Sequence, residues 1–292
     1  MPQASSNIGQ STCPVCGDSV RDLFEKHSLM IRECLNCRHQ FYVPPDVESH
    51  VSSVYGDDYF QGSPAGYTDY LGEEKAQRLS AKYYVRQAAR FRQPGRSLDV
   101  GAACGFFVKE FLDAGWQATG LEPNATMRMT ARQRYGLELF EGQFKELPEG
   151  EAYDLVSMIQ VISHLIDPVD SIKEVRSRLS AKGLFLVETW DRRSLAAMAS
   201  GRGWHEYNPP SVLHWFSRRS LRELVESQGF RLLAKGLPRK RIQLGRASQM
   251  IRHSVEESTL GRWMTWPLSL APANLVVPYF LGDAFWMLFQ KK

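Results

Sequence analysis

The sequence predicts an α/β fold, in which a doubly wound and mostly parallel sheet follows a small cysteine-rich module. Short apolar strands alternate with amphipathic helices from residue 96 onward, and a glycine-rich turn joins the first of these strands to its helix. Four of the five cysteines form two CxxC pairs within the first forty residues. Serial strand–helix units favour parallel strands with helices on both faces of the sheet.

Apolar periodicity and helix-stop residues place each element of this sheet. The expected strands are 97–100, 117–121, 137–140, 153–159, 184–188, 230–234 and a closing strand at 284–289. The expected helices are 73–92, 104–114, 125–134, 169–179 and 217–228. We expect Ser217 to cap the last of these helices, and Lys182 and Gly183 to close the helix before the fifth strand.

Composition and element order divide the chain into four segments. These are a cysteine ribbon at 11–45, an aromatic connector or lid with the leading helix at 46–95, the sheet-and-helix core at 96–237, and a helical insertion with the closing strand at 238–292. The connector is too rich in tyrosine for a disordered linker, so we expect it to pack on the core. The leading helix should bury one apolar stripe, formed by Ala76, Leu79, Tyr83, Ala88 and Phe91.

The formal net charge of +4 is modest, and the basic residues are spread along the chain. Nucleic-acid-binding domains usually cluster Lys and Arg, so the charge disfavours nucleic acid as a partner. Residues 1–10 are polar and no run of about 18 apolar residues occurs, so we expect no secretory signal, no transmembrane helix and a cytoplasmic location. The most apolar stretch, 263–289, is interrupted by prolines and Asp283, so we expect it to form a helix and a strand that pack on the core. The alternative is that this stretch contacts a membrane surface.

The cysteine ribbon predicts a metal site rather than disulfides. Cys13 and Cys16, then Cys34 and Cys37, form the two CxxC pairs, with seventeen residues between them. That spacing suits a β-hairpin that brings two pairs of thiolates to one point, and Zn²⁺ takes four such ligands in a closed tetrahedron. Such a site is structural, so we expect Zn²⁺ to stabilise the fold. A ligand set with His39 in place of one cysteine is less favoured.

A nucleoside site is predicted where the first core strand meets its helix. The turn at 99–105 reads DVGAACG, which lets a ligand approach the backbone closely, and Glu122 ends the second strand, where an acid can bind two ribose hydroxyls. The turn lacks the GxGxxG pattern that holds a pyrophosphate. Asp99 at its start would repel a pyrophosphate and attract a cationic group, which favours S-adenosylmethionine (SAM).

The same turn resembles the DxGxGxG motif of class I SAM-dependent methyltransferases, with Ala103 where the middle glycine usually stands. Residues 121–123, 142–148 and 153–156 are similar to that family's ribose, adenine and fourth-strand segments, and 160–168 resembles its LEHLxDP continuation, with Ser163 replacing Glu. The resemblance implies a Rossmann-like, seven-stranded sheet. Together with the turn chemistry it gives a candidate set of SAM contacts: Asp99, Gly101, Ala103, Gly105, Phe106, Glu122, Gln143, Phe144, Gln160 and Tyr67.

Both ends of the chain are similar to one bacterial subgroup of these enzymes. A four-cysteine ribbon followed by the pattern YxxDYF…GYxDY, and later Trp204 and the HWFS sequence at 214–217, resembles methyltransferases that act on sugars, polysaccharides or natural products. The resemblance implies a small-molecule or glycan acceptor.

A hydroxyl acceptor benefits from a general base, and histidine suits that role near neutral pH. His164 lies just beyond the fourth strand, at the carboxyl edge of the sheet where ligands bind, and ranks first. His205 and His214 lie in the loop after the fifth strand, and His214 ranks second. The competing interpretation of each histidine is structural, as a helix cap or a loop hydrogen-bond partner. Candidate lid residues that would pack against the sulfonium are Tyr55, Tyr59, Tyr67 and Tyr70.

Two other functions stay open. An RNA methyltransferase would use the ribbon as a reader, together with the basic run at 239–241 and Arg246, which is otherwise a solvated loop. A non-catalytic cofactor-binding or assembly protein would explain Ala103 and Ser163. The NPP sequence at 208–210 resembles the signature of amino-group methyltransferases, but it follows the fifth strand rather than the fourth, so we interpret it as a loop.

Overall fold

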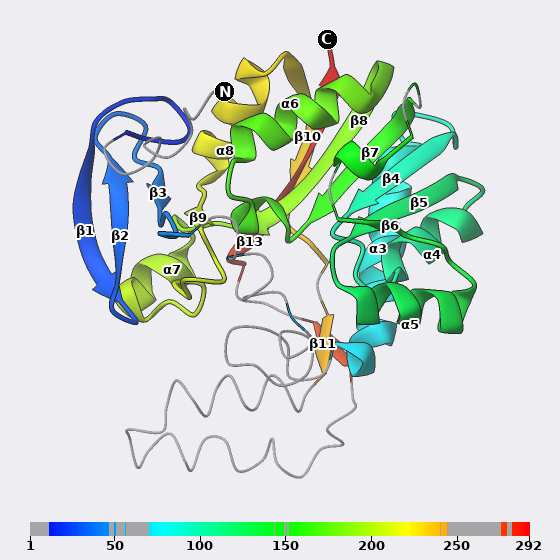
Figure 1. Cartoon of the computed structure of the whole chain (residues 1–292), viewed down its shortest axis with the longest axis horizontal. Helices are drawn as coiled ribbons and strands as arrows, with labels where there is room; N and C mark the ends of the chain where they lie inside the picture. The colour runs from blue at the N-terminus through cyan, green and yellow to red at the C-terminus, as the bar shows by residue number, and fades with distance from the viewer. Residues whose placement is uncertain are drawn as a thin grey trace.

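Two sheets organise the molecule, a central seven-stranded sheet and a smaller four-stranded sheet beside it (Figure 1). The structure, a computed structural model, describes residues 12–46, 50, 56, 70–142, 144–148, 150, 152–239, 241–243, 276–278 and 282–292. The predictions for Tyr55, Tyr59, Tyr67 and Gln143 lie outside the described residues, as does most of the predicted helical insertion. No helix in the described ranges is long and apolar enough to cross a membrane.

The central sheet has the strand order β10-β13-β8-β7-β4-β5-β6. Its strands are β4 (Arg96–Val100), β5 (Gln117–Glu122), β6 (Phe140–Glu141), β7 (Tyr153–Ile159), β8 (Leu179–Trp190), β10 (Phe230–Gly236) and β13 (Ala284–Lys291). Strands β4 to β8 pair in parallel, whereas β13 pairs antiparallel with both β8 and β10. The predicted seven-stranded, mostly parallel sheet and its closing C-terminal strand are therefore confirmed.

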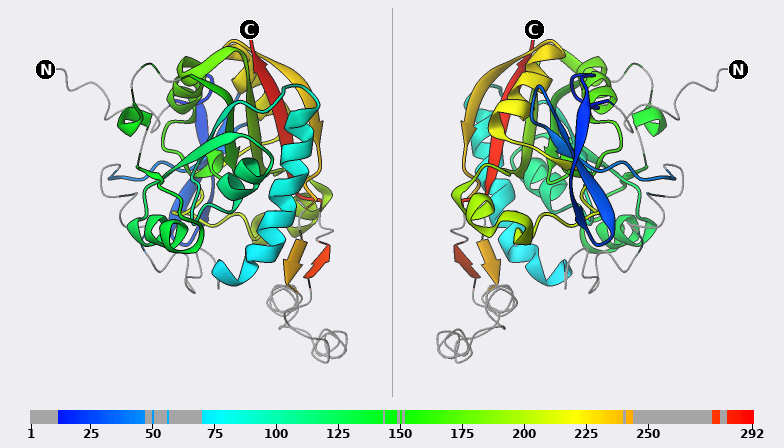
Figure 2. Two further views of the ribbon diagram at one scale, coloured as in Figure 1. Left: turned by 90° about the vertical axis from the view of Figure 1, so that its right-hand side faces the viewer. Right: turned by 90° about the vertical axis from the view of Figure 1, so that its left-hand side faces the viewer.

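Helices cover both faces of this sheet, as the views in Figure 2 show. They are α3 (Glu74–Ala89), α4 (Phe106–Asp113), α5 (Ala125–Tyr135), α6 (Pro168–Arg178) and α8 (Arg218–Ser227). The short helix α7 (Leu195–Ser200) lies beside the smaller sheet instead, where its Ala197 packs in a cluster with Ile31 and Tyr42 (Figure 1). Successive side chains of a strand point to opposite faces. Phe185 and Val187 of β8 accordingly pack in the core with α6 and α8, and Leu184 and Leu186 pack in the core with α3 and α4.

Two local predictions are wrong. In the predicted stripe of α3, Phe91 is exposed beyond the end of the helix, and Tyr83 is only partly buried against the core, whereas its neighbour Tyr84 is fully buried. Lys182 and Gly183 do not close α6, because that helix ends at Arg178 and runs directly into β8. The chain from 180 to 183 bulges out of the β7–β8 pairing, which joins Tyr153 to Leu179 and then Leu155 to Leu184.

Helix caps account for other boundaries. Ser217 accepts a hydrogen bond from the backbone N–H of Ser220 and forms a capping box with it, which confirms the predicted start of α8. Asn124 caps α5 in the same way through the N–H of Met127, and Gly136 ends that helix in the left-handed conformation that glycine favours.

The smaller sheet is built mainly from the cysteine ribbon. β1 (Val20–Lys26) and β2 (Leu29–Cys34) form the predicted hairpin, and β3 (Gln40–Phe41) pairs with β2. Its fourth strand, β9 (His214–Trp215), comes from the loop after β8 and pairs antiparallel with β3 (Figure 1). The ribbon therefore shares one sheet with a segment of the core. A third, two-stranded sheet joins β11 (Arg241–Gln243) to β12 (Val276–Pro278).

Candidate active site

The turn after β4 is held against the end of β5 by backbone hydrogen bonds. The N–H groups of Gly101 and Ala102 both donate to the Leu121 carbonyl, at 2.9 Å. A Cβ on Gly101 would lie 2.5 Å from Cγ2 of Val161, and its φ is +72°, so glycine is required there for space and for conformation. Ala103 also has a positive φ, +47°, which costs an alanine more than the glycine usual in the resembling motif.

Glu122 lies at the carboxyl end of β5 and is 3% exposed. One carboxylate oxygen accepts the N–H of Ala103 at 2.7 Å, and the other accepts the N–H of Asn124 at 2.8 Å. Burial raises the pKa of Glu122 to about 6, although both N–H donors and Arg128 act in the opposite direction. Each oxygen keeps a second lone pair, which is what a pair of ribose hydroxyls requires.

Asp99 ends β4 and is also buried, at 6% exposure. Ser157 of β7 donates its hydroxyl to Asp99 Oδ1 at 2.6 Å. Burial raises the pKa of Asp99 to about 7; the Ser157 hydrogen bond lowers it, and the negative charge of Glu122 raises it further. Two buried acids beside one close-approach turn fit a ligand that brings positive charge and hydroxyl groups, as SAM does.

Gln160 follows β7 and joins a buried polar network. Its φ is +61°, and its side-chain amide donates to Glu188 Oε1 at 2.6 Å. Tyr84 of α3 donates its hydroxyl to the other oxygen of Glu188, which is 1% exposed. These hydrogen bonds hold the side chain of Gln160 in place at the start of the 160–168 segment.

The remaining predicted cofactor contacts have different surroundings. Gly105 has a φ of +81° and precedes the first turn of α4, where a Cβ would lie 2.7 Å from Leu137. Phe106 is fully buried and stacks on Tyr70, with ring centroids 5.5 Å apart. Its ring packs in one cluster with Ala103 and Cys104 of the turn. Phe144 is partly buried against the core. Cofactor contact by these side chains stays a prediction.

His164 ends the short 3₁₀ helix η3 (Ile162–His164) that follows β7. Its Nδ1 lies 2.7 Å from the backbone carbonyl oxygen of Ser211. Because a carbonyl can only accept, Nδ1 carries the proton of the neutral ring and Nε2 carries the lone pair. Burial lowers the pKa of His164 below 6.5, the Ser211 carbonyl opposes this shift, and nearby His50 adds to it. A neutral ring with its lone pair on Nε2 is the form that a general base needs.

The other two histidines are placed differently. His214 is 3% exposed in β9, and its Nδ1 lies 3.1 Å from Nε2 of His39. Burial lowers the pKa of His214 to about 4. His205 is partly exposed, and its Nε2 lies 3.3 Å from Glu206 and 3.7 Å from the buried carboxylate of Asp283. His164 is thus the histidine whose hydrogen bond fits the base prediction most directly.

Three side chains of these networks were not among the predicted site residues: Ser157, Glu188 and Tyr84. Ser157 and Glu188 did carry a signal, since each is a polar residue directly after a run of apolar residues in its strand, and buried polar groups have partners. Tyr84 carried none, because its neighbour Tyr83 fits the helical stripe equally well. The partner of His164 is the backbone carbonyl of Ser211, and every residue type has such a group, so the sequence could not identify it.

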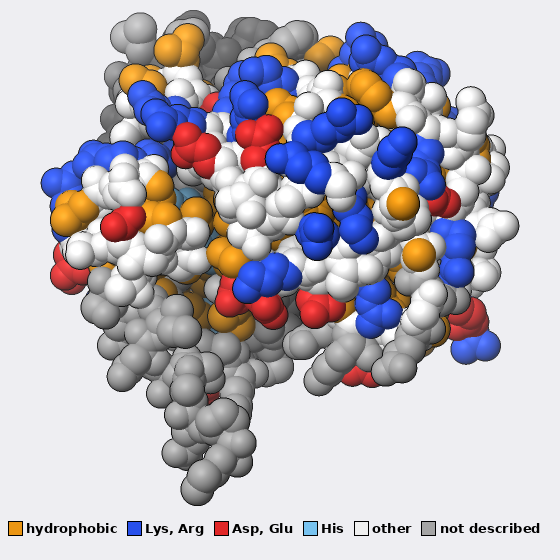
Figure 3. Space-filling view, turned by 90° about the horizontal axis from the view of Figure 1, so that it is seen from above, with side chains coloured by type: hydrophobic (Ala, Val, Ile, Leu, Met, Phe, Trp, Pro, Cys, Tyr) orange, Lys and Arg blue, Asp and Glu red, His pale blue; other side chains and the backbone are white. Residues whose placement is uncertain are grey.

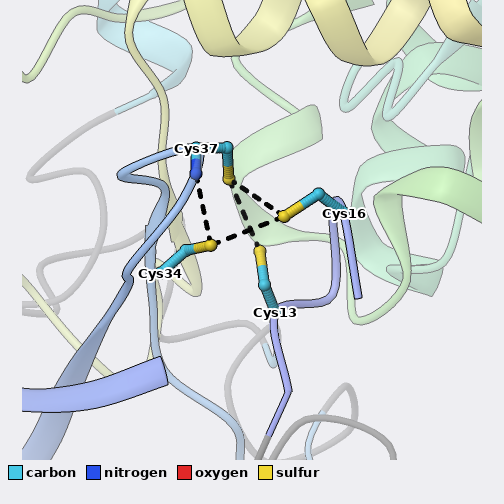
Figure 4. A group of neighbouring side chains, drawn as sticks. All are labelled: Cys13, Cys16, Cys34 and Cys37. Atoms are coloured by element: carbon cyan, nitrogen blue, oxygen red, sulfur yellow. Dashed lines mark hydrogen bonds between the residues drawn. The ribbon is translucent and has the colours of Figure 1, made fainter. Parts of the chain in front are cut away.

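The four predicted metal ligands meet at one point (Figure 4). Their sulfur atoms all lie within 4.8 Å of one another, with Cys16 and Cys34 at 3.4 Å and Cys13 and Cys37 at 3.7 Å. Burial raises the pKa of Cys16 to about 12; a backbone hydrogen bond from Asp18 opposes this shift, and the neighbouring thiols of Cys34 and Cys37 add to it. A divalent cation would remove that penalty. The imidazole of His39 is not part of this group, because its Nε2 lies 3.1 Å from Nδ1 of His214.

Of the predicted basic run, the structure describes the side chain of Arg239. Arg239 lies over the ring of Tyr83, 5.3 Å from its centroid. Lys240 and Arg246 lie outside the described residues. Figure 3 shows Lys and Arg side chains distributed over one face of the molecule, with acidic and uncharged side chains between them. The NPP sequence forms a loop before β9, as predicted.

Comparisons with known proteins identify the family of the core. The methyltransferase domain family matches residues 73–235, more than half of the 292-residue chain. A ubiquinone biosynthesis O-methyltransferase of Histophilus somni is 24% identical over 165 residues, which cover 47% of this chain and 69% of that protein. An uncharacterized methyltransferase of Alkaliphilus oremlandii is 27% identical over 82 residues, or 28% of this chain and 38% of that protein.

The chain spans between 38% and 69% of the length of the curated relatives it matches. A solved SAM-dependent methyltransferase from Archaeoglobus fulgidus has the same fold, with a TM-score of 0.50 and 18% identity over 76% of this chain and 99% of that one. The family match covers the cofactor turn, both buried acids and η3. The chain therefore belongs to the methyltransferase domain family, and its core has the fold of SAM-dependent methyltransferases.

Proposed function

We propose that this enzyme transfers a methyl group from SAM to a hydroxyl group of a small-molecule acceptor, in the class of sugars, glycans or natural-product intermediates. The observation that carries the proposal is the hydrogen bond between Nδ1 of His164 and the Ser211 carbonyl, which leaves a lone pair on Nε2. The ubiquinone O-methyltransferases among the relatives support a small, hydroxyl-bearing acceptor.

The chain contributes position and a base. When bound, SAM supplies a methyl group that its positively charged sulfur has already activated. Asp99 would hold the cationic amino end, and Glu122 would hold the ribose hydroxyls through the lone pairs that its N–H donors leave available. Nε2 of His164 would take the proton that an acceptor hydroxyl loses on methylation. Fixing both reactants in line supplies most of the rate gain for such a transfer.

Transfer of labelled methyl groups tests the acceptor class. The assay offers sugar nucleotides, phenolic small molecules and RNA to the full chain under the same conditions. Product from a small molecule supports the proposal, whereas product from RNA alone would identify the ribbon and the basic run as an RNA reader. SAM binding without product on any acceptor would favour a non-catalytic role.

SAM affinity should fall as the pH drops through about 7. Burial raises the pKa of Asp99 to about 7, so protonation below that pH removes the negative charge that attracts the amino group. Glu122, with a pKa of about 6, extends the loss to lower pH. Calorimetric titration with SAM between about pH 8 and about pH 5.5 measures the effect. Asp99→Asn should bind SAM weakly at every pH and should no longer show the change in affinity near pH 7. If the affinity of the wild type for SAM does not change over this range, Asp99 does not hold the amino group.

We also propose that one structural Zn²⁺ per chain is held by Cys13, Cys16, Cys34 and Cys37. The support for this proposal is that all four sulfur atoms lie within 4.8 Å of one another. Metal analysis of the purified chain should give one zinc, and Cys34→Ser should give well below one and melt at lower temperature. Cys104→Ala is the control, because Cys104 is buried in the core beside Phe106, away from the sulfur cluster. Equal zinc content in the wild type and Cys34→Ser would refute the site.

A further inference from the structure

The segment 205–216 lies between the cysteine ribbon and the turn that carries His164. On one side, β9 pairs with β3, and the N–H of Tyr42 donates to the Leu213 carbonyl at 2.8 Å. On the other side, the N–H of Leu213 donates to the Ser163 carbonyl at 2.9 Å. The backbone of one residue, Leu213, is therefore bonded both to the ribbon and to the residue next to His164.

Side chains reinforce the contact between β3 and this segment. Tyr207 donates its hydroxyl to Gln40 Oε1 at 2.6 Å, and both residues are buried. Ile31 and Tyr42 of the ribbon pack in one apolar cluster with Trp204 and with four residues of the segment, Tyr207, Val212, Leu213 and Trp215. Burial of this kind excludes water and allows few alternative arrangements, so the position of the segment depends on an ordered ribbon.

The same segment supplies the partner of His164. Ser211, two residues before Leu213, provides the carbonyl that accepts the Nδ1–H at 2.7 Å. That hydrogen bond decides which ring nitrogen carries the proton and which way the ring faces. A displacement of 211–213 would weaken the bond and let the neutral ring exchange its proton between nitrogens.

We propose that the cysteine ribbon acts as a positioning element for the acceptor half of the reaction, through the path β3–β9–Ser211–His164. Gln40 and Tyr207 are positioning residues on this path. The proposal rests on the proposed role of His164 as base. Asp99 and Glu122 lie on β4 and β5, and none of their hydrogen bonds among the described residues goes to the ribbon, so SAM binding should not depend on the path.

Cys16→Ser tests the path from its metal end, since Cys16 is the exposed cysteine of the four. Tyr207→Phe tests it at the contact itself by removing one hydroxyl, and it decides the question if Cys16→Ser does not fold. Asp22→Asn is the control, because Asp22 is an exposed residue of β1, the strand farthest from β9 in the sheet. Three kinds of measurement are made on the full chain: amide hydrogen exchange, ¹⁵N NMR of the histidine rings for the tautomer of His164, and assays that give kcat together with the Kd of SAM.

Both test variants should exchange faster at 211–215, lose the single Nδ1–H tautomer of His164 and lower kcat by roughly 10- to 100-fold, while the Kd of SAM stays within about twofold. The control should match the wild type in all three. Faster exchange confined to the ribbon, with 211–215 and the tautomer unchanged, would overturn the proposal and make the ribbon a separate stability module. A changed tautomer with unchanged kcat would support the path and refute His164 as the base.

Discussion

His164→Asn should lower kcat by about 10²- to 10⁴-fold, the usual contribution of a general base. Asparagine is chosen because its side-chain amide nitrogen occupies the place of Nδ1 and can still donate to the Ser211 carbonyl, whereas nothing replaces Nε2. The variant therefore keeps the loop contact and removes the lone pair. The Kd of SAM should not change, since both buried acids are untouched.

The pH profile separates loss of a base from loss of structure. Burial lowers the pKa of His164 below 6.5, so the neutral, active ring persists through neutral pH and kcat should fall only as the pH drops through that lowered pKa. In His164→Asn this acid limb should disappear. His27→Gln, at the exposed hairpin turn of the ribbon, serves as the control. A His164→Asn kcat within about threefold of the wild type would remove His164 from the base role and direct attention to His205.

The fold was predictable because its signals are local. β7 begins and ends where its apolar run does, and α8 begins at the capping serine. The errors occur where local patterns are ambiguous. Tyr83 and Tyr84 are adjacent and equally apolar, and the contact with Glu188 on a distant strand decides which one is buried. A Lys-Gly pair is a common helix stop, but here it serves a bulge in β8, where Lys182 has a φ of +57°.

The same difference between local and long-range signals decides which residues of the site could be predicted. Residues of the cofactor turn could be named from sequence because one short loop and one strand end contain them, and parallel strands bring their carboxyl ends to one edge. The acceptor side depends on pairings between distant segments. β3 and β9 are separated by more than 170 residues, and no periodicity in either dipeptide predicts that they join. The ribbon therefore looks independent in sequence, although in the structure it shares a sheet with the loop beside His164.

Glu122→Ala should weaken SAM binding by about 10²-fold or more, because a buried charged acceptor is removed and its partners are left unsatisfied. The carboxylate holds the N–H groups of Ala103 and Asn124, and so it connects the turn after β4 to the start of α5. Its loss would remove the proposed ribose contact and free the turn at Ala103, whose positive φ already has a conformational cost. Glu141→Ala is the matched control, since Glu141 ends the next strand but is exposed and paired with Arg128. Calorimetry should show the loss for Glu122→Ala alone. If both variants bind SAM equally well, the buried acid at the end of β5 does not hold the cofactor.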